Sequence, residues 1–498
     1  MNVNPITRLD YPDLDVIRVE DTYYMVSTTM HFMPGCEILQ SFDLVHWEHV
    51  TYVYETLDHT DAQQLKKGQN IYGQGMWAAS LRYHEGRFCI CFVANDTRKT
   101  YLYTSEKIDG PWKKQLIEGF YHDGSLLFDE DGRNYIVYGN DEIWITELNE
   151  DLTAPKKDGL HRLLVSDHKN PELGYEGSHI QKINGYYYIF LIHSLRDRWM
   201  RTEACFYSDS LEGEFTGGDV LCDDRGYCGQ GVAQGGIVDT PDGKWYAMLF
   251  QDSGAVGRIP ILLPVTWKDH FPFFGQNGHV PEEIEVHSTR PGYIYQPLVG
   301  SDDFCNGLLP RWQFNHDPDP RYYHLDALQG TYTITTREVC TELTQAVNTL
   351  TQRMSYPSCA AEVTVDASAL KEGDVAGLCA LQSCYAAVGI TKHHGKYEVL
   401  MLDKKEDGIL DMTEGTVVES HQMDFRLEAD FCNMKDEARC YYRVNKGDWL
   451  PIGNVHKLYF KLDHFTGCRF GLFCYAAEET GGSACFRDFK YYDVDEIS

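Results

Sequence analysis

Five runs of mostly aromatic and aliphatic residues, each bounded by turn-forming Gly, Asp or Asn, recur along the first 300 residues. They occupy residues 21–29, 86–96, 132–141, 184–194 and 243–253. Three of them begin at an Asp-Gly or Asn-Gly pair, the strongest short signal for a β-hairpin. A further segment with alternating apolar and polar positions follows each run, which is typical of an outer β-strand. The pattern therefore predicts five small antiparallel sheets.

A short cluster precedes each run and marks the start of a repeat, and the first aromatic residue of the run lies 10 to 12 residues after the cluster residue. The five clusters are centred on Asp13, Trp77, Asp123, Glu176 and Ala233. Repeats of about 45 to 65 residues that are built from small sheets are typical of β-propellers, with one blade for each repeat. We therefore expect a five-bladed β-propeller over residues 1–300, with the cluster positions meeting in one funnel at the central channel.

The pattern changes near residue 300, where many short alternating segments separated by turn residues follow one another. Regularly spaced short strands of this kind predict a β-sandwich, here a jelly-roll or concanavalin-like domain over residues 301–498. A chain of 498 residues is long enough for two domains. The predicted fold class is all-β.

The charge balance limits the partners of the chain. Lys and Arg number 44 against 75 for Asp and Glu, which gives a net charge of −31. Such a surface repels nucleic acid and anionic membranes, whereas a neutral sugar is compatible with it. Solubility alone also explains the charge. The N-terminal residues resemble no signal peptide and no apolar run approaches membrane length. We therefore expect a cytoplasmic protein, with its 16 cysteines reduced and no zinc site.

Three of the five clusters carry a carboxylate beside Pro or Gly, namely Asp13, Asp123 and Glu176. Three acids around an aromatic pocket suggest glycoside hydrolysis, in which one carboxylic acid protonates the leaving oxygen and another carboxylate attacks C1 or activates water. The acid must stay protonated near neutral pH, and a third carboxylate nearby can raise its pKa by like-charge repulsion. Each of these residues could also be a turn or structural residue when taken alone.

Four segments resemble glycoside hydrolase family 43 in order and spacing. They are NPITRLDYPDLDVIRVEDTYYMVST, HDGSLLFDEDGRNYIVYG, YEGSHIQKINGYYYIF and GGIVDTPDGKWYAMLFQDSGAVGRIP. The C-terminal half, including NTLTQR at Asn348, is similar to the β-sandwich of the β-xylosidase and α-L-arabinofuranosidase branch. The resemblance implies an inverting enzyme with Asp13 as general base and Glu176 as general acid. It implies that Asp123 orients Glu176 and tunes its pKa.

The same resemblance suggests residues that bind the sugar. Arg258 would hydrogen-bond hydroxyls of the terminal sugar and Trp77 would form a wall of its subsite, while Gln234 and Phe32 are further substrate-binding candidates. Many members have a channel His where this chain has Ala233, so a metal held there is not expected and Gln234 could take that place. The branch also places a sandwich aromatic at the rim of the site. The matching stretch here puts Arg469 near that point.

No cofactor is expected to be required, and no metal is assigned to the site. Asp302, Asp303 and Asp488 are candidates for a structural calcium at the ends of the sandwich, although solvated turns are the simpler explanation. Exposed sandwich faces leave a homo-oligomer open.

The predicted function is the exo-acting release of terminal α-L-arabinofuranose, β-D-xylose or both from arabinoxylan or xylo-oligosaccharides. A fructan-cleaving propeller glycosidase is a second reading, but its W-M-N-D-P-N-G opening and E-C-P motif are absent. A non-catalytic carbohydrate-binding propeller is a third reading, which loss of one carboxylate would favour.

Overall fold

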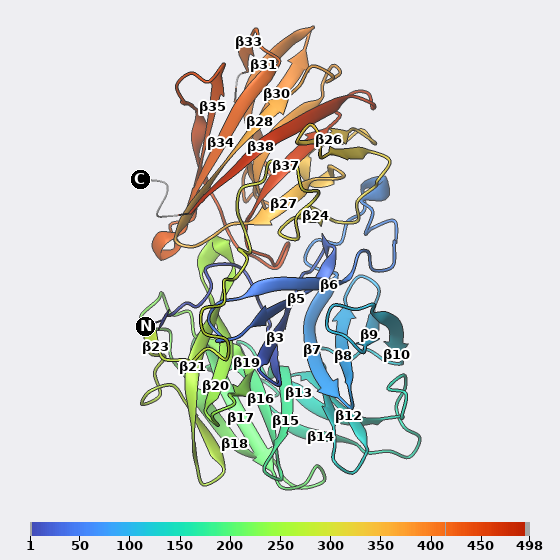
Figure 1. Cartoon of the computed structure of the whole chain (residues 1–498), viewed down its shortest axis with the longest axis vertical. Helices are drawn as coiled ribbons and strands as arrows, with labels where there is room; N and C mark the ends of the chain where they lie inside the picture. Colours follow the sequence, from blue (N-terminus) through green and yellow to red (C-terminus); the bar gives the residue numbers. More distant parts are fainter. Residues whose placement is uncertain (1, 414, 494–498) are drawn as a thin grey trace.

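The structure is a computed structural model that describes residues 2–413 and 415–493. Over these residues the chain forms β-strands and four short 3₁₀ helices, with no α-helix. The predicted all-β class is therefore confirmed. Figure 1 shows two bodies, with the N-terminal half of the chain below and the C-terminal half above.

The N-terminal half is a five-bladed propeller in which each blade is a four-stranded antiparallel sheet, with its strands in sequence order. The innermost strands of blades 1 to 5 are β2 (Asp15–Val19), β7 (Met76–His84), β11 (Ser125–Phe128), β15 (Glu176–Ile183) and β19 (Ala233–Asp239). The second strands are β3 (Thr22–Ser27), β8 (Arg87–Ala94), β12 (Asn134–Asn140), β16 (Tyr186–Ser194) and β20 (Trp245–Asp252). The third strands are β5 (Gly35–Ser41), β9 (Lys99–Ser105), β13 (Glu142–Leu148), β17 (Arg201–Ser208) and β21 (Arg258–Lys268). The outermost strands are β6 (Glu48–Tyr54), β10 (Lys113–Ile117), β14 (His161–Ser166), β18 (Thr216–Leu221) and β22 (Phe271–Phe274).

The predicted hairpins join the first and second strands of the blades. At the turn of blade 4, Asn184 has φ of 51° and Gly185 has φ of 84°. A two-residue hairpin turn that follows the twist of its strands needs positive φ at both positions, which Asn tolerates and Gly adopts freely. The five cluster residues found in the sequence each lie within two residues of the start of an innermost strand.

The ring of blades is closed by a short pairing between the two ends of the propeller. Strand β1 (Asn2–Val3) pairs antiparallel with β23 (Glu283–Ile284). The Asn4 side chain donates hydrogen bonds to the carbonyl oxygens of Leu262 (2.7 Å) and Pro281 (3.0 Å). The start of the chain is thereby fastened to blade 5.

The C-terminal half is a sandwich of two antiparallel sheets with an extensive apolar core between them. One sheet contains β24 (Gln313–Asn315), β27 (Leu350–Arg353), β29 (Val375–Leu381), β30 (Ala386–His393), β31 (Lys396–Lys404), β32 (Leu410–Met412), β33 (Thr416–Val418) and β37 (Arg469–Tyr475). The other contains β25 (Tyr323–Asp326), β26 (Thr331–Thr335), β28 (Ser358–Asp366), β34 (Gln422–Asp430), β35 (Glu437–Val444), β36 (Leu450–Lys457) and β38 (Ser483–Asp493). The predicted propeller and sandwich are both present.

The two domains share backbone hydrogen bonds. Strand β4 (Phe32–Met33), from the propeller half, pairs with β24 at the edge of the first sandwich sheet. Nearby, the buried side chains of Arg353 and Glu37 form an ion pair of 2.9 Å across the interface. Because a sheet and a buried charge pair both cross the boundary, the sandwich is held against one face of the propeller.

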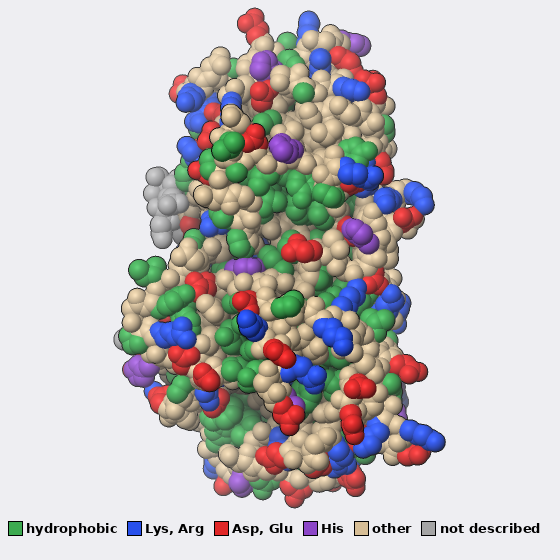
Figure 2. All heavy atoms as spheres, turned by 45° about the vertical axis from the view of Figure 1, so that its right-hand side comes forward, with side chains coloured by type: hydrophobic (Ala, Val, Ile, Leu, Met, Phe, Trp, Pro, Cys, Tyr) green, Lys and Arg blue, Asp and Glu red, His purple; other side chains and the backbone are tan. Residues whose placement is uncertain are grey.

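Charged side chains of both signs lie at the surface (Figure 2), and the cysteines are free thiols. Lys and Arg side chains are interspersed with Asp and Glu over the face shown in Figure 2. All sixteen cysteines lie within the described residues and none forms a disulfide. Within those residues, no helix has the length and apolar character needed to cross a bilayer.

Candidate active site

A cavity of about 730 Å³ lies between the propeller and the sandwich. Its propeller side includes Trp77, His122 and Glu176, and its sandwich side is the segment 457–465. Asp13, Asp123 and Arg258 are packed directly behind these lining residues, as the contacts below describe. The three acids span 163 residues of the sequence and meet at one place, because each lies at the start of an innermost strand or two residues before it.

Asp13 is held by contacts to both carboxylate oxygens. Arg258 Nη1 donates to its Oδ1 at 2.8 Å, and Thr28 Oγ1 donates to its Oδ2 at 2.8 Å. Asp13 is 7% exposed and has φ of 51°, a left-handed conformation that Asp adopts more readily than most residues. Arg258 is buried and its guanidinium lies 4.3 Å from the Phe465 ring centroid. The sandwich therefore covers the Asp13–Arg258 pair.

Asp123 is tied to the segment that carries Glu176. Its Oδ2 accepts a hydrogen bond from the Gly177 backbone N–H at 3.0 Å. Burial raises the pKa of Asp123 to about 6, and the charges of Glu176 and Asp13 add to this while His122 opposes it. Gly177 has φ of 65°, and a Cβ at this position would lie 2.8 Å from the Gln234 side chain. Only glycine fits this turn without displacing Gln234.

Glu176 presents one oxygen to the protein and lines the cavity. Its Oε2 accepts a hydrogen bond of 2.6 Å from Asn140 Nδ2, and the His122 Nε2 lies 3.5 Å from the same oxygen. Among the described residues, no hydrogen bond to Oε1 is present. His122 Nε2 is also 3.6 Å from Asp123 Oδ2. The negative charge of Asp123, aided by Glu176 and Asp13 and opposed by burial, raises the pKa of His122 to about 9.

Aromatic residues from both domains form the walls of the cavity. The Trp77 ring centroid is 5.7 Å from that of Phe465, and Phe460 lies beside Phe465 at 5.9 Å. Trp77 Nε1 is buried and has no hydrogen-bond partner among the described residues. The flat faces of sugar rings pack well on such aromatic surfaces. The outer wall carries Trp199, which is 44% exposed.

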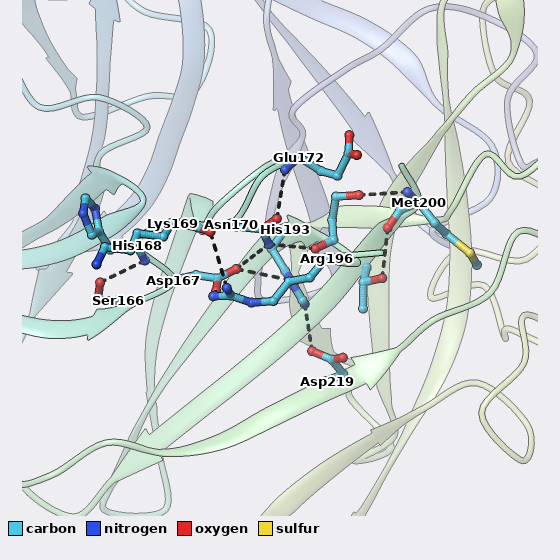
Figure 3. A network of polar contacts seen from close by, with 12 residues as sticks. Ser166, Asp167, His168, Lys169, Asn170, Glu172, His193, Arg196, Met200 and Asp219 are labelled. Atoms are coloured by element: carbon cyan, nitrogen blue, oxygen red, sulfur yellow. Dashed lines mark hydrogen bonds and ion pairs between the residues drawn. The ribbon is translucent and has the colours of Figure 1, made fainter. Parts of the chain in front are cut away.

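A polar network fixes the loops that support this outer wall, as Figure 3 shows. Asp167 accepts a hydrogen bond from Asn170 Nδ2 at 2.7 Å and pairs with Arg196. The His193 ring lies between Asp167 and Asp219, with Nε2 2.8 Å from the Asp219 Oδ1. These contacts join the loop that follows β14 to the loop that follows β16. The positions of Glu172 and Trp199 at the cavity mouth depend on this network, since those residues lie on the two loops.

The Arg82 side chain contacts several blades behind the site. Its guanidinium donates to Asp15 Oδ2 (2.6 Å), Ser125 Oγ (2.8 Å), and the carbonyl oxygens of Leu126 (2.9 Å) and Ile180 (3.2 Å). These partners come from the innermost strands of blades 1, 3 and 4, and Arg82 itself belongs to blade 2. One fixed cation therefore links four blades beneath the carboxylates.

The comparisons with known proteins agree with this geometry. The family model described as glycosyl hydrolases family 43 matches residues 3–272, and the model described as beta xylosidase C-terminal concanavalin A-like domain matches residues 301–492. The chain belongs to glycoside hydrolase family 43. As a member of this family it is a glycosidase, as the sequence predicted.

Two curated relatives carry names that describe their substrates. A beta-xylosidase of Formosa agariphila is 26% identical over 99% of this chain and 89% of its own length. A non-reducing end alpha-L-arabinofuranosidase of Bacteroides ovatus is 23% identical over 82% of this chain and 79% of its own length.

Two solved structures of the family have the same fold over the whole chain. A bifunctional GH43-CE protein of Bacteroides eggerthii is 42% identical with a TM-score of 0.92, and the match covers 100% of this chain. This chain spans only 64% of the length of that protein. An engineered family 43 glycoside hydrolase that displays both endo-xylanase and exo-arabinofuranosidase activity is 26% identical, with a TM-score of 0.88 and 99% coverage of both chains.

Two residues suggested from the family resemblance lie elsewhere. Phe32 is buried in β4 at the domain interface, where the Arg469 guanidinium is 3.5 Å from its ring centroid. It does not line the cavity, so its placement gives no support to a substrate-binding role. Arg469 is not at the rim either, because it is buried in β37 and donates to Gln313 Oε1 at 2.8 Å. The aromatic side chains that the sandwich brings to the cavity are Tyr459, Phe460 and Phe465.

Gln234 lies behind Glu176 rather than in the cavity wall. Its backbone N–H donates to Glu203 Oε2 at 2.7 Å, and its side chain packs beneath Gly177. Glu203 is fully buried and burial raises its pKa well above the ordinary value. Gln234 therefore supports the backbone next to Glu176. Its predicted contact with substrate stays a prediction.

Ligand atoms of His122, Asp123 and Glu176 lie within 4.8 Å of one another. Within this group the charge of Asp123 raises the pKa of His122 to about 9, which favours the imidazolium over the neutral ring that binds metals. That no cofactor or metal is required stays a prediction. In the sandwich, Asp302 accepts from Trp312 Nε1 at 2.8 Å and from the Phe304 N–H at 2.7 Å. A structural calcium there stays a prediction.

Sequence reasoning assigned no role to several residues that form the site. Asn140 ends the second strand of blade 3 and Trp199 follows that of blade 4, where a polar or aromatic residue gives no signal of its own. Phe460 and Phe465 come from the other domain. His122 was visible only as the neighbour of Asp123 in HDGS, and its raised pKa depends first on Asp123 and then on Glu176, which is 54 residues away in the sequence.

Proposed function

We propose that this protein is an exo-acting, inverting glycosidase that releases terminal α-L-arabinofuranose, β-D-xylose or both from xylan-derived oligosaccharides. The observation that carries the proposal is the meeting of Asp13, Asp123 and Glu176 beside a cavity walled by aromatic side chains. The names of the family 43 relatives support the choice of xylose and arabinose.

Each carboxylate has a contact that suits its role in a single displacement. Asp13 is fixed by Arg258 and Thr28 and retains free lone pairs, so it can take a proton from the attacking water. Glu176 faces the cavity and gives its proton to the leaving oxygen as the bond to C1 breaks. Asp123 holds the backbone next to Glu176 and adds negative charge beside it.

The sandwich favours attack at chain ends. Its segment 457–465 covers one side of the cavity, where an internal position of a long chain would need an open groove. The cavity of about 730 Å³ has room for a terminal pentose and part of its acceptor. Removing one terminal sugar in each reaction suits this closed shape.

The proposal is tested by hydrolysis of the 4-nitrophenyl α-L-arabinofuranoside and β-D-xylopyranoside, followed by arabinoxylan and xylan oligosaccharides. The Asp13→Ala and Glu176→Ala variants should lose about 100- to 10,000-fold in kcat, the usual worth of acid–base groups. Asp151→Asn, at an exposed turn away from the cavity, is the matched control. Proton NMR of the first product should show inverted configuration. A retained configuration, or normal rates for both Ala variants, would contradict the assignment.

A further inference from the structure

His122 lies between the two carboxylates on the proton-donor side of the site. Its Nε2 is 3.5 Å from Glu176 Oε2 and 3.6 Å from Asp123 Oδ2, and this nitrogen is buried with no hydrogen-bond partner among the described residues. The ring also lines the cavity beside Trp77, with the two ring centroids 5.8 Å apart. A polar atom that is buried and directed at two acids calls for a role beyond filling space.

The surroundings of His122 favour the imidazolium. Asp123, Glu176 and Asp13 all face it, and their charges raise its pKa to about 9 against the effect of burial. Two arginines of the site are already paired, Arg258 with Asp13 at 2.8 Å and Arg201 with Asp252 at 3.0 Å. The His122 imidazolium therefore supplies a positive charge beside Glu176 within this group of acids.

The contacts of Glu176 also identify the oxygen that holds its acidic proton. Asn140 Nδ2 donates to Oε2 at 2.6 Å and His122 Nε2 approaches the same oxygen. An oxygen that faces two donors acts as the acceptor, so the proton of the neutral acid belongs on Oε1. Oε1 is then the atom that faces the leaving group.

We propose that His122 is a positioning residue whose imidazolium stabilises the charge that develops on Glu176 as the leaving oxygen is protonated. This inference rests on the proposed function. In the step, the O–H bond of Glu176 breaks, a new O–H bond forms on the leaving oxygen, and the bond from that oxygen to C1 breaks. The electron pair of the broken O–H bond stays on the Glu176 carboxylate. His122 keeps its own proton and faces the growing negative charge, which a preorganised cation in a site shielded from water stabilises strongly.

The demand for this stabilisation depends on the leaving group. A nitrophenolate leaves with little protonation, whereas a sugar hydroxyl must receive the proton of Glu176. Removing the His122 charge should therefore impair the cleavage of sugar–sugar bonds more than that of aryl pentosides. A residue that merely fills space would affect both substrates alike, because both place the same pentose in the same subsite.

The experiment compares wild type with His122→Gln, His122→Phe and His122→Lys on the 4-nitrophenyl pentoside and on the disaccharide of the same pentose. We expect kcat/KM of the Gln and Phe variants to fall by about 10- to 100-fold on the disaccharide, the worth of one hydrogen bond to a charged group. On the aryl pentoside the fall should be under about threefold. The Lys variant restores a cation and should recover part of the loss on the disaccharide.

Further readouts separate the possible outcomes. Near-ultraviolet circular dichroism and the melting temperature identify any variant that is misfolded, and the three substitutions provide alternatives if one fails. Equal losses on the two substrates, or a Gln variant as active as wild type on the disaccharide, would overturn the role of His122 while the proposed function stands. Absence of pentosidase activity in the wild type would overturn both. In addition, the pH profile of the Gln variant on the disaccharide should differ from that of wild type in its alkaline limb.

Discussion

Replacing Arg82 by methionine should destabilise the propeller by about 3 to 5 kcal/mol at neutral pH, because it leaves Asp15 as an uncompensated buried charge. The Arg82 and Asp15 side chains are only 13% and 1% exposed, so solvent screening is weak. Methionine keeps most of the volume of the arginine stem but none of the four hydrogen bonds to neighbouring blades.

The pKa of Asp15 gives an independent measure of the interaction. Burial alone would raise it, but the Arg82 charge and a hydrogen bond from His179 lower it from 3.8 to about 2. At about 1.4 kcal/mol per pH unit, this corresponds to about 2 kcal/mol of stability. Because the folded-state pKa lies below the unfolded one, this stability is present above pH 3.8 and is lost as the pH falls through 2. In the Arg82→Met variant burial dominates, so the variant should instead become less stable as the pH rises towards neutral.

Urea denaturation followed by circular dichroism at pH 4 to 7 measures these effects. Arg87→Met, at an exposed position of the same blade, is the matched control and should cost little. The double variant Asp15→Asn with Arg82→Met should recover part of the loss, since it removes the unpaired charge. The reasoning is refuted if Arg82→Met and Arg87→Met denature at the same urea concentration, or if their difference does not grow as the pH rises.

Two further predictions concern the domain interface. Burial lowers the pKa of His464 to about 3 and holds those of His31 and His316 well below 6.5, so unfolding takes up protons and stability should fall as the pH drops below 6.5. His464→Phe should reduce the slope of unfolding free energy against pH by about one third, since it removes one of three such groups; an unchanged slope would contradict this. Phe465→Ala should lower kcat/KM for pentosides by about tenfold or more, since it uncovers the Arg258–Asp13 pair. Leu462→Ala, at a rim residue that is 71% exposed, should have a much smaller effect, and equal losses would count against the role of Phe465.

The blades could be predicted because their signals are local. The turn at Asn184 and Gly185 needs positive φ at both residues, and the sequence shows this need directly. The same holds for the start of each innermost strand, where Asp13, Asp123 and Glu176 occupy repeated positions. Once the repeats close into a ring, the meeting of these acids follows from symmetry. The sequence of this one chain was therefore enough to predict the fold and the meeting of its three carboxylates.

Contacts between the domains leave no such periodic signal. Nothing in the sequence around Phe32 predicts a strand. In the structure Phe32 belongs to β4, which forms the edge strand of the sandwich sheet, and its ring packs under Arg469. Arg469 itself aligned with a rim position of the family, and its burial between the domains became visible only when β24 and β37 were in place. A position can be assigned by resemblance, but its exposure depends on partners from elsewhere in the chain.

The charges of the site depend on the same kind of distant partner. Arg82 alternates with apolar neighbours in its strand and resembles an ordinary exposed arginine, yet it donates hydrogen bonds to residues of three other blades. The charge of the adjacent Asp123, with those of Glu176 and Asp13 from two other blades, raises the pKa of His122 to about 9. Sequence reasoning placed the acids and Arg258 but not His122 and Arg82, because the role of a cation in a propeller depends on the residues that other blades bring to it. The protonation of Glu176 therefore depends on residues that only the closed ring brings together. The His122 variants test the charge beside Glu176, and the Arg82 variant tests the contacts between the blades that carry these residues.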